Sequence, residues 1–255
     1  MNLTEAADVL LEAESSARDR PPLSDEWQGL DLATAYEVQD ETLRRRLARG
    51  ERLVGLKLGL TSVAKQRTMG IDRPLVAWLT DAMVLSPGEP IGEGLIHPRA
   101  EPEIVFVLGA RLEGPGLTAA EALQAVTAVY AGVEIIDSRF TDFRFTLPDV
   151  VADNASAARF VVGPVGVAPS GLDLSLEACL LQVDGQVVDS ATGAAVQGHP
   201  AQALAFAANT LAERGLRLEP GWTVLTGGMT DAVPMPPGAT LTAEFTHLGT
   251  IVLQT

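Results

Sequence analysis

The sequence predicts an α+β protein in which a helical N-terminal region packs on a mixed, mostly β core. Two helices are expected early, over 4–18 and 32–49, and the second places apolar residues such as Leu32, Tyr36 and Leu43 on one face. From residue 80 onward the predicted strands outnumber the helices. The strands and helices do not alternate regularly, which excludes a doubly wound parallel sheet.

The first strand is expected over "RLVGLKLGL", residues 52–60, directly after the basic helix end "LRRRLARG" closed by Gly50. Alternation along this strand puts Lys57 on the same face as two glycines, which leaves space around its ammonium. A lysine in a strand is more often a surface residue whose stem lies along the sheet, so both interpretations stay open. Thr61 or Ser62 is expected to cap a short helix that ends at Gly70.

The central part of the chain alternates between strand and helix signals. "EIVFVLG" (103–109) predicts a strand, and the capping box "TAAE" (118–121) predicts a helix to about residue 128. "VEIIDSRFTDF" (133–143) continues a strand expected over 131–137. "VADNASAARF" (151–160) is typical of a turn and helix N-terminus, with Asp153 or Asn154 as the cap.

The C-terminal third predicts a hairpin, a helix and further strands. Asp-Gly in "CLLQVDGQVVD" is the signal of a tight hairpin turn, and "AQALAFAANTLAERG" predicts a helix that stops at Gly215. "WTVLTGG" and "ATLTAEFTHLGTIVLQT" predict strands. The glycines of "LTGG" (225–228) are expected in a turn that could bring backbone close to a ligand.

Composition excludes several functional classes. The 255-residue chain has a net charge of -15, which opposes binding to nucleic acid, because phosphate contacts need a basic surface. Its single cysteine, Cys179, excludes an intrachain disulfide and lies among apolar residues as an expected buried, inert thiol. No secretory signal and no apolar stretch long enough for a membrane helix are found, so a cytoplasmic location without membrane partners is expected.

Three glutamates are the strongest candidates for a functional site. Glu101 and Glu103 are two residues apart at the start of a strand, so their carboxylates point the same way. Glu134 lies among Val133, Ile135 and Ile136, where an ionised carboxylate is costly unless a cation pairs with it. Three carboxylates without cysteine or paired histidine suit Mg²⁺ or Mn²⁺. The alternative for Glu-x-Glu is a solvated strand edge.

The remaining polar residues have ordinary structural explanations. Asp137 and Arg139 are expected either to form a salt bridge that supports the glutamates or to contact a substrate. His97, His199 and His247 are scattered along the chain and are expected to be structural.

Four motifs in order and spacing resemble one protein family. "GLKLGLTS", "HPRAEPEI", "VEIIDSRF" and "VVADNASAARF" look like the hydratase/decarboxylase branch of the fumarylacetoacetate hydrolase superfamily, and the likeness extends from about residue 33 to 247. The resemblance implies a twisted mixed β-roll core of the fumarylacetoacetase C-terminal type. It suggests a mainly helical region over 1–75 that carries the Lys57 strand, and a β-rich catalytic core over 76–255, working as one unit.

The resemblance also implies a metal-dependent lyase. By position, Glu101, Glu103 and Glu134 match the family's Mg²⁺ ligands, and Lys57 matches a catalytic residue. The expected substrate-binding residues are Ser156, Asp153, Leu75, Thr61 and Arg139. A homo-oligomer is expected, together with an association with a partner hydratase that receives an unstable dienol.

One stretch bears on the choice between the two sister activities. Hydratases of this branch tend to have Pro-Asp-aromatic-Gly where this chain has Pro74 and Leu75, followed by "WLTD". An apolar residue after the proline resembles the decarboxylases, although Val76 and Ala77 depart from both patterns. The resemblance therefore implies carbon–carbon cleavage of the 2-oxo dicarboxylic acid 2-oxohex-3-enedioate to 2-hydroxypenta-2,4-dienoate, with hydration of that dienoate as the alternative.

Overall fold

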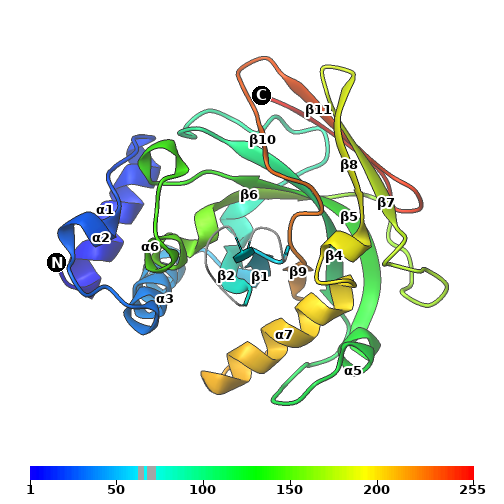
Figure 1. The fold of residues 1–255 in the computed structure, drawn as a ribbon, viewed down its shortest axis with the longest axis horizontal. Helices are drawn as coiled ribbons and strands as arrows, with labels where there is room; N and C mark the ends of the chain where they lie inside the picture. The colour runs from blue at the N-terminus through cyan, green and yellow to red at the C-terminus, as the bar shows by residue number, and fades with distance from the viewer. Residues whose placement is uncertain (63–65, 68–72) are drawn as a thin grey trace.

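A computed structural model describes residues 1–62, 66–67 and 73–255 of the chain. The N-terminal region contains three helices, at the left of Figure 1: α1 (Leu3–Ser16), α2 (Leu23–Glu26) and α3 (Leu32–Ala48). Asn2 and Glu5 form a capping box that starts α1, and Asp31 caps α3. These helices and α6 (Leu147–Ala152) bury a small apolar cluster of their own.

The largest element is an eight-stranded sheet whose order is β2-β1-β9-β4-β5-β6-β3, with β10 paired to β4. Its strands are β1 (Leu53–Gly59), β2 (Leu75–Thr80), β3 (Val84–Leu85), β4 (Arg99–Leu108), β5 (Val126–Ile136), β6 (Ala157–Val162), β9 (Thr223–Leu225) and β10 (Val233–Pro234).

The chain itself requires this sheet to curl. Strands β2 and β3 stand at opposite ends of the sheet order, yet only the 3₁₀ turn η1 (Asp81–Met83) separates them along the chain. A flat sheet would hold its two end strands far apart, because neighbouring strands lie about 5 Å from one another. The sheet therefore bends into a half-barrel, seen around β1 and β2 at the centre of Figure 1.

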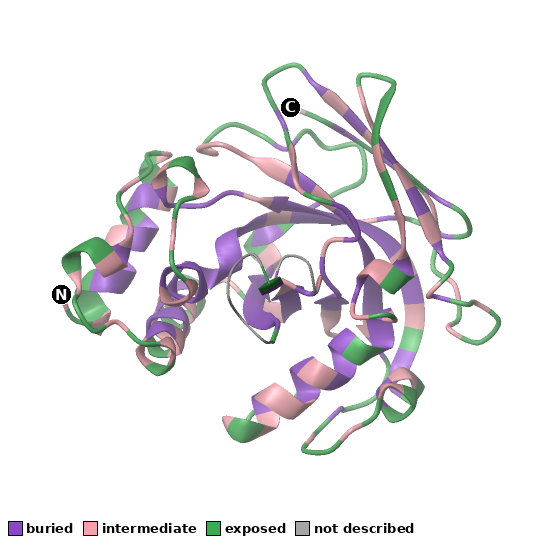
Figure 2. Ribbon diagram, in the orientation of Figure 1, coloured by how far each residue is buried: buried purple, intermediate pink, exposed green. Residues whose placement is uncertain are grey.

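A second sheet of four strands packs beside the first, in the order β12-β11-β7-β8. It consists of β7 (Ala178–Val183), β8 (Gln186–Thr192), β11 (Thr240–Phe245) and β12 (Gly249–Gln254). Asp184 and Gly185 make the predicted hairpin turn, both with positive φ. The main hydrophobic core is shared between the two sheets and helix α7 (Pro200–Glu213). Strand β2 is buried along its whole length whereas the edge strand β8 is largely exposed, a contrast that Figure 2 shows.

The remaining helical elements connect and cover the sheets. Helix α5 (Ala119–Gln124) packs on α7 (Pro200–Glu213). Three short 3₁₀ turns are η2 (Thr141–Phe143), η3 (Asn154–Ser156) and η4 (Gly193–Ala195). Within the described part of the chain, no helix is both long enough and apolar enough to cross a bilayer.

The predicted α+β class is confirmed, and two local expectations were wrong. The helix from 118 ends at Gln124 rather than near 128, because Val126, Thr127 and Val129 favour a strand, and Val126 and Val129 pair with β4. "VADNASAARF" does not start a helix: it holds the end of α6, the turn η3 and the beginning of β6. The short helix expected from Thr61 or Ser62 to Gly70 falls largely outside the described residues.

Candidate functional site

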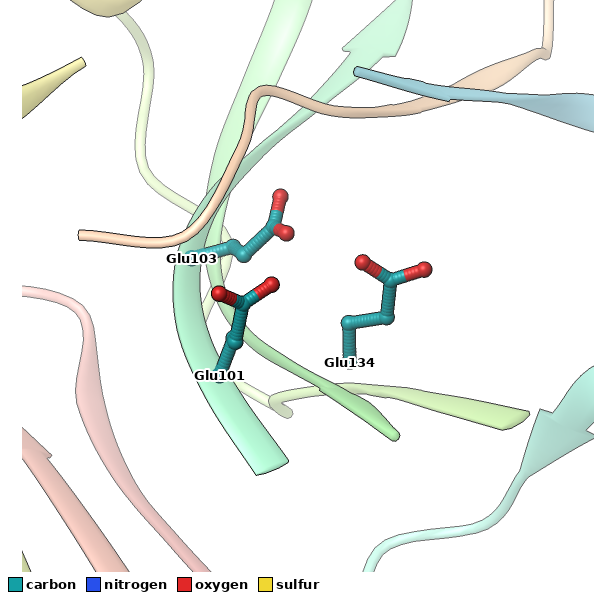
Figure 3. Close-up of side chains that lie close together, drawn as sticks. All are labelled: Glu101, Glu103 and Glu134. Carbon is teal, nitrogen blue, oxygen red and sulfur yellow. The ribbon is translucent and has the colours of Figure 1, made fainter. Parts of the chain in front are cut away.

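Three carboxylates converge on the concave side of the curled sheet. Glu101 and Glu103 extend from β4, and Glu134 extends from β5 directly opposite Glu101 in the antiparallel register. Because partners in such a register point to the same face, the pleat alone brings the three side chains together. One oxygen from each carboxylate lies within 4.8 Å of the others. Figure 3 shows the three side chains directed at one common space.

Burial makes this cluster electrostatically unfavourable by itself. Glu103 and Glu134 are 0% and 1% exposed. Burial raises the pKa of Glu103 well above its usual range, and the Glu134 and Glu101 carboxylates raise it further. The pKa of Glu134 is also raised by burial, although Lys57 acts in the opposite direction. Such a cluster is stabilised either by taking up protons or by holding a cation.

A buried carboxylate oxygen without a partner fits a divalent cation. The Oε1 atom of Glu103 is buried and accepts no hydrogen bond from the described residues, whereas Glu134 Oε1 lies 3.0 Å from the Lys57 Nζ atom. Buried polar atoms without partners are rare and point to a group that the protein alone does not supply. Three hard carboxylate donors in one place suit Mg²⁺ or Mn²⁺ and do not suit zinc.

Lys57 reaches the same cluster from β1. Its Nζ atom lies 3.0 Å from Glu134 Oε1 and donates a hydrogen bond to Oε2 at 3.1 Å. The lysine is 2% exposed and stands on an internal strand between β2 and β9, so it is not a surface residue. Gly55 and Gly59 flank it on its own face, as the alternation predicted.

A pair of glycines, expected from the sequence in a turn, completes one wall of the site. The Gly227 amide donates to Glu103 Oε2 at 2.6 Å. A Cβ atom at Gly227 would lie 2.1 Å from Thr61 Oγ1, and one at Gly228 would lie 2.7 Å from the Glu101 Cδ atom. The backbone here passes so close to the carboxylates that no side chain fits. The signal available in the sequence was "TGG" after a short strand, where backbone could approach a ligand.

The predicted substrate-binding residues form a second group near the turn η3. Arg139 pairs with Asp153, and both are buried. Ser156 is also buried, with its Oγ atom 3.4 Å from Asp153 Oδ2. Leu75 lies beside Gly59 and opposite it in the β1–β2 register. Thr61 stands apart from this group, against the Gly227 backbone.

The Arg139 guanidinium donates its hydrogen bonds to other groups of the protein. It donates to the Asp153 carboxylate and to three backbone carbonyls, those of Asp137, Asp153 and Ala157. Burial lowers the pKa of Arg139, but the carboxylates of Asp153, Glu14 and Asp137 together outweigh this effect and raise the pKa above its ordinary value. The side-chain salt bridge expected as one alternative between Asp137 and Arg139 is not formed. Arg139 pairs with Asp153 instead, and the Asp137 carboxylate accepts the backbone amides of Ile96 and His97.

Other reactive side chains have structural partners elsewhere. Cys179 is buried in β7, and desolvation raises its pKa to about 12. His97 contacts the Ser138 carbonyl, and His199 caps α7. His247 pairs with the buried Glu177 at 2.7 Å, a histidine–glutamate pair that the sequence did not reveal. It belongs to the four-stranded sheet region, between the turn after β11 and the start of β7, and not to the carboxylate cluster.

Comparison with known families supports the resemblance seen in the motifs. The fumarylacetoacetate (FAA) hydrolase C-terminal family matches residues 57–254, a range that contains Lys57, all three glutamates and the Gly227–Gly228 backbone. The chain belongs to the fumarylacetoacetate hydrolase family. The family match begins within β1, at Lys57, so it includes the rest of the curled sheet and leaves the N-terminal helices outside.

Individual members of the family are similar over almost the whole chain. A 4-oxalocrotonate decarboxylase from Pseudomonas sp. (strain CF600) is 42% identical over 243 residues, which cover 95% of this chain and 92% of that protein. A 2-hydroxyhexa-2,4-dienoate hydratase from Comamonas testosteroni is 39% identical, with 96% and 94% covered. Among solved structures, the 4-oxalocrotonate decarboxylase from Pseudomonas putida G7, complexed with magnesium and adipate, matches with a TM-score of 0.95 at 38% identity, covering 99% and 96%.

Proposed function

We propose that this protein is a Mg²⁺-dependent carboxy-lyase that converts 2-oxohex-3-enedioate to 2-hydroxypenta-2,4-dienoate and CO₂. The observation that carries the proposal is the buried carboxylate cluster with Lys57 against it. The 42% identical relative is named for this decarboxylation, and the similar solved structure holds magnesium and a six-carbon dicarboxylate. Both support a role in the breakdown of aromatic compounds by meta-cleavage of catechols.

The proposed Mg²⁺ ligands are Glu101, Glu103 and Glu134, with Mn²⁺ as a possible substitute. When bound, such a cation supplies Lewis acidity to the carbonyl oxygen of a 2-oxo acid. The chain's own contribution is to hold the three carboxylates in place: the β4–β5 register fixes Glu101 opposite Glu134, and the Gly227 amide orients Glu103. The low polarity of the surroundings strengthens each of these interactions.

Decarboxylation requires electrons to flow from the breaking bond to the oxygen on C2. When the C5–C6 bond of 2-oxohex-3-enedioate breaks, its electron pair forms C4=C5, the C3=C4 pair moves to C2=C3, and the C2 oxygen takes up one proton. We propose that Lys57 Nζ donates a hydrogen bond or that proton to this oxygen as negative charge develops there. The two glycines beside it do not open space for a substrate, because a Cβ atom at Gly55 would lie 1.8 Å from the Thr223 carbonyl oxygen and one at Gly59 would contact Ala155 and Leu75.

The substrate is proposed to lie between the carboxylates and the turn η3. Ser156, Thr61 and Leu75 would line it, and the Arg139–Asp153 pair would support Ser156 from behind. Because the donors of Arg139 are directed at protein acceptors, its proposed role is to hold the pocket rather than to bind a substrate carboxylate.

A second candidate function is the hydration of 2-hydroxypenta-2,4-dienoate. It is favoured by relatives named as hydratases that are 39% and 41% identical to this chain, nearly the identity of the decarboxylases. Addition of water needs a group that accepts a proton from the attacking water molecule. The apolar Leu75, which stands where hydratases of this branch tend to have an acid, favours decarboxylation.

One experiment separates the two functions. Purified protein is incubated with 2-oxohex-3-enedioate and, separately, with 2-hydroxypenta-2,4-dienoate, each with Mg²⁺ and with EDTA, while the ultraviolet absorbance of the substrate and the released CO₂ are followed. Release of CO₂ that requires Mg²⁺ is expected. Loss of the dienoate without release of CO₂ from the first substrate would identify a hydratase, and full turnover in EDTA would refute the metal-dependent mechanism.

The resemblance further supports three proposals about the protein in the cell. We propose that it is cytoplasmic, that it forms a homo-oligomer, and that it associates with a partner hydratase. The last proposal has a chemical basis, because the dienol product is unstable and is best passed directly to the enzyme that consumes it. The division into residues 1–75 and 76–255 is likewise proposed, with β1 joining the two parts within one sheet.

A further inference from the structure

The turn η3 has an unusual backbone. Its three residues, Asn154, Ala155 and Ser156, all have positive φ, at 50°, 49° and 58°. Residues other than glycine occupy this left-handed region at an energetic cost, and asparagine tolerates it better than alanine or serine does. Three such residues in succession persist only where the surrounding structure holds them.

Asn154 uses this backbone to reach across the open side of the half-barrel. Its Oδ1 atom accepts the Trp78 amide at 2.8 Å, and its Nδ2 atom donates to the Trp78 carbonyl at 2.9 Å. Trp78 lies in β2, the end strand of the sheet, and within the described residues no strand pairs with its outer edge. The side-chain amide therefore satisfies the Trp78 backbone amide and carbonyl, as the backbone of a further strand would.

This contact joins the two parts of the sheet that carry Lys57 and Glu134. On one side, β2 holds β1, with Ala77 opposite Lys57. On the other, η3 runs directly into β6, where Phe160 is opposite Glu134. Along the sheet, β9 and β4 separate β1 from β5, so the Lys57–Glu134 contact is made across the curl and not between neighbouring strands. Its length thus depends on how tightly the curl is closed.

The turn is anchored firmly on its β6 side. Asp153, just before it, is held by the buried Arg139. The Ser156 carbonyl accepts the Asp137 amide at 2.8 Å, which fixes the turn to the end of β5. On the β2 side, by contrast, the hydrogen bonds between the turn and the strand, within the described residues, are the two that the Asn154 side chain makes with Trp78.

We infer that Asn154 is a positioning residue for the proposed reaction: together with the η1 connection, its amide closes the half-barrel and so sets the Lys57 ammonium against Glu134 and the substrate. This inference rests on the proposed function, because it makes turnover depend on the distance between Lys57 and Glu134. The three metal-binding candidates belong to β4 and β5, which pair directly, so their geometry does not depend on Asn154.

The test compares two variants that lose the same kind of contact. Asn154→Gly keeps the left-handed turn, since glycine adopts positive φ freely, and removes only the amide. Asn209→Ala is the matched control. Asn209 of α7 makes the same two bonds to one residue, accepting the Leu117 amide at 2.9 Å and donating to its carbonyl at 3.0 Å, on the part of the fold where α7 packs on α5.

Both variants are expected to unfold at a lower temperature than the wild type, because each leaves a backbone amide and carbonyl without partners. At a temperature where both are fully folded, kcat of Asn154→Gly is expected to fall by about a hundredfold, the effect of a displacement of about 1 Å in an active site. Asn209→Ala should keep the kcat of the wild type. The Kd for Mg²⁺, measured by calorimetry, should change by less than about threefold in both.

Three outcomes decide the inference. A kcat of folded Asn154→Gly within twofold of the wild type overturns it, as does a weakening of Mg²⁺ binding large enough to explain the whole loss. A crystal structure of the variant should show the Lys57 Nζ–Glu134 Oε1 distance longer than 3.0 Å, and an unchanged distance also overturns it. Wild-type protein that releases no CO₂ refutes the proposed function instead, and the crystallographic distance then still tests the role of Asn154.

Asn154→Asp provides a second variant if Asn154→Gly does not fold. Aspartate also tolerates positive φ and keeps the acceptor for the Trp78 amide, but it loses the donor to the carbonyl. Its kcat is expected to lie between those of the wild type and Asn154→Gly, and a wild-type kcat would again overturn the inference.

Discussion

Replacement of Lys57 by methionine tests the electrostatics of the site most directly. The substitution keeps the length of the side chain and removes its charge from a pair with both partners almost fully buried. At a separation of 3.0 Å and an effective dielectric constant near 20, the attraction between these charges is about 5.5 kcal/mol. Removing one partner of a buried pair typically lowers the free energy of unfolding by about 3–5 kcal/mol, because the other charge is left without compensation.

The loss should depend on pH in a defined direction. Burial raises the pKa of Glu134 and Lys57 lowers it, so the variant lets that pKa rise further. A carboxyl with a raised pKa in the folded state contributes stability below its unfolded pKa and loses that contribution as the pH rises through its folded pKa. The variant should therefore be destabilised most at pH 8, and the difference from the wild type should shrink as the pH falls toward 5.

The assay is urea unfolding at both pH values with EDTA present, followed by tryptophan fluorescence. Arg52→Met is the control, because it removes the exposed ion pair with Asp81, in which the arginine side chain is 81% exposed. It should change the free energy of unfolding by about 0.5 kcal/mol or less at either pH. If Lys57→Met matches this control at pH 8, the buried pair does not stabilise the fold and the electrostatic argument for the site is wrong. With Mg²⁺ bound, the same variant should lose turnover.

Three further predictions concern the same region. Because burial raises the pKa of Glu103, Mg²⁺ binding should release more protons at pH 5 than at pH 8, seen as a binding enthalpy that varies with the buffer, and Glu103→Gln should lose both the binding and the release. Gly227→Ala should weaken Mg²⁺ binding at least tenfold, whereas Gly185→Ala, also at positive φ but in open space, should lower only stability, by about 1 kcal/mol. Arg139→Met should lower the unfolding free energy by about 3–5 kcal/mol, measured by urea unfolding, since it leaves Asp153 buried without its partner.

Local chemistry explains why much of the site could be predicted from the sequence. The pleat of a strand has a period of two, so Glu101 and Glu103 had to share a face, and a glutamate between valine and isoleucine had to find a partner. The same alternation placed Lys57 between two glycines. These deductions need only neighbouring residues and the geometry of one strand.

What could not be predicted depends on contacts between distant parts of the chain. No local pattern reveals that Glu134 lies opposite Glu101, since a shift of one residue in the β4–β5 register would turn Glu134 to the other face. Asn154 shows the same limit. Asparagine favours both helix caps and left-handed turns, and only the position of Trp78 across the curl decides in favour of the turn.

The curl itself explains why these distant contacts coincide with the site. A carboxylate cluster on a flat sheet would face water, which would screen its charges and leave it without a partner lysine. Closing the sheet excludes that water and raises the pKa values of Glu103 and Glu134, and it brings Lys57 across from β1 as the opposing charge. The repulsion and desolvation of the carboxylates destabilise the cluster by itself, and a bound cation offsets both. The elements that close the sheet, the η1 connection between β2 and β3 and the amide of Asn154, should therefore influence the chemistry without touching the substrate.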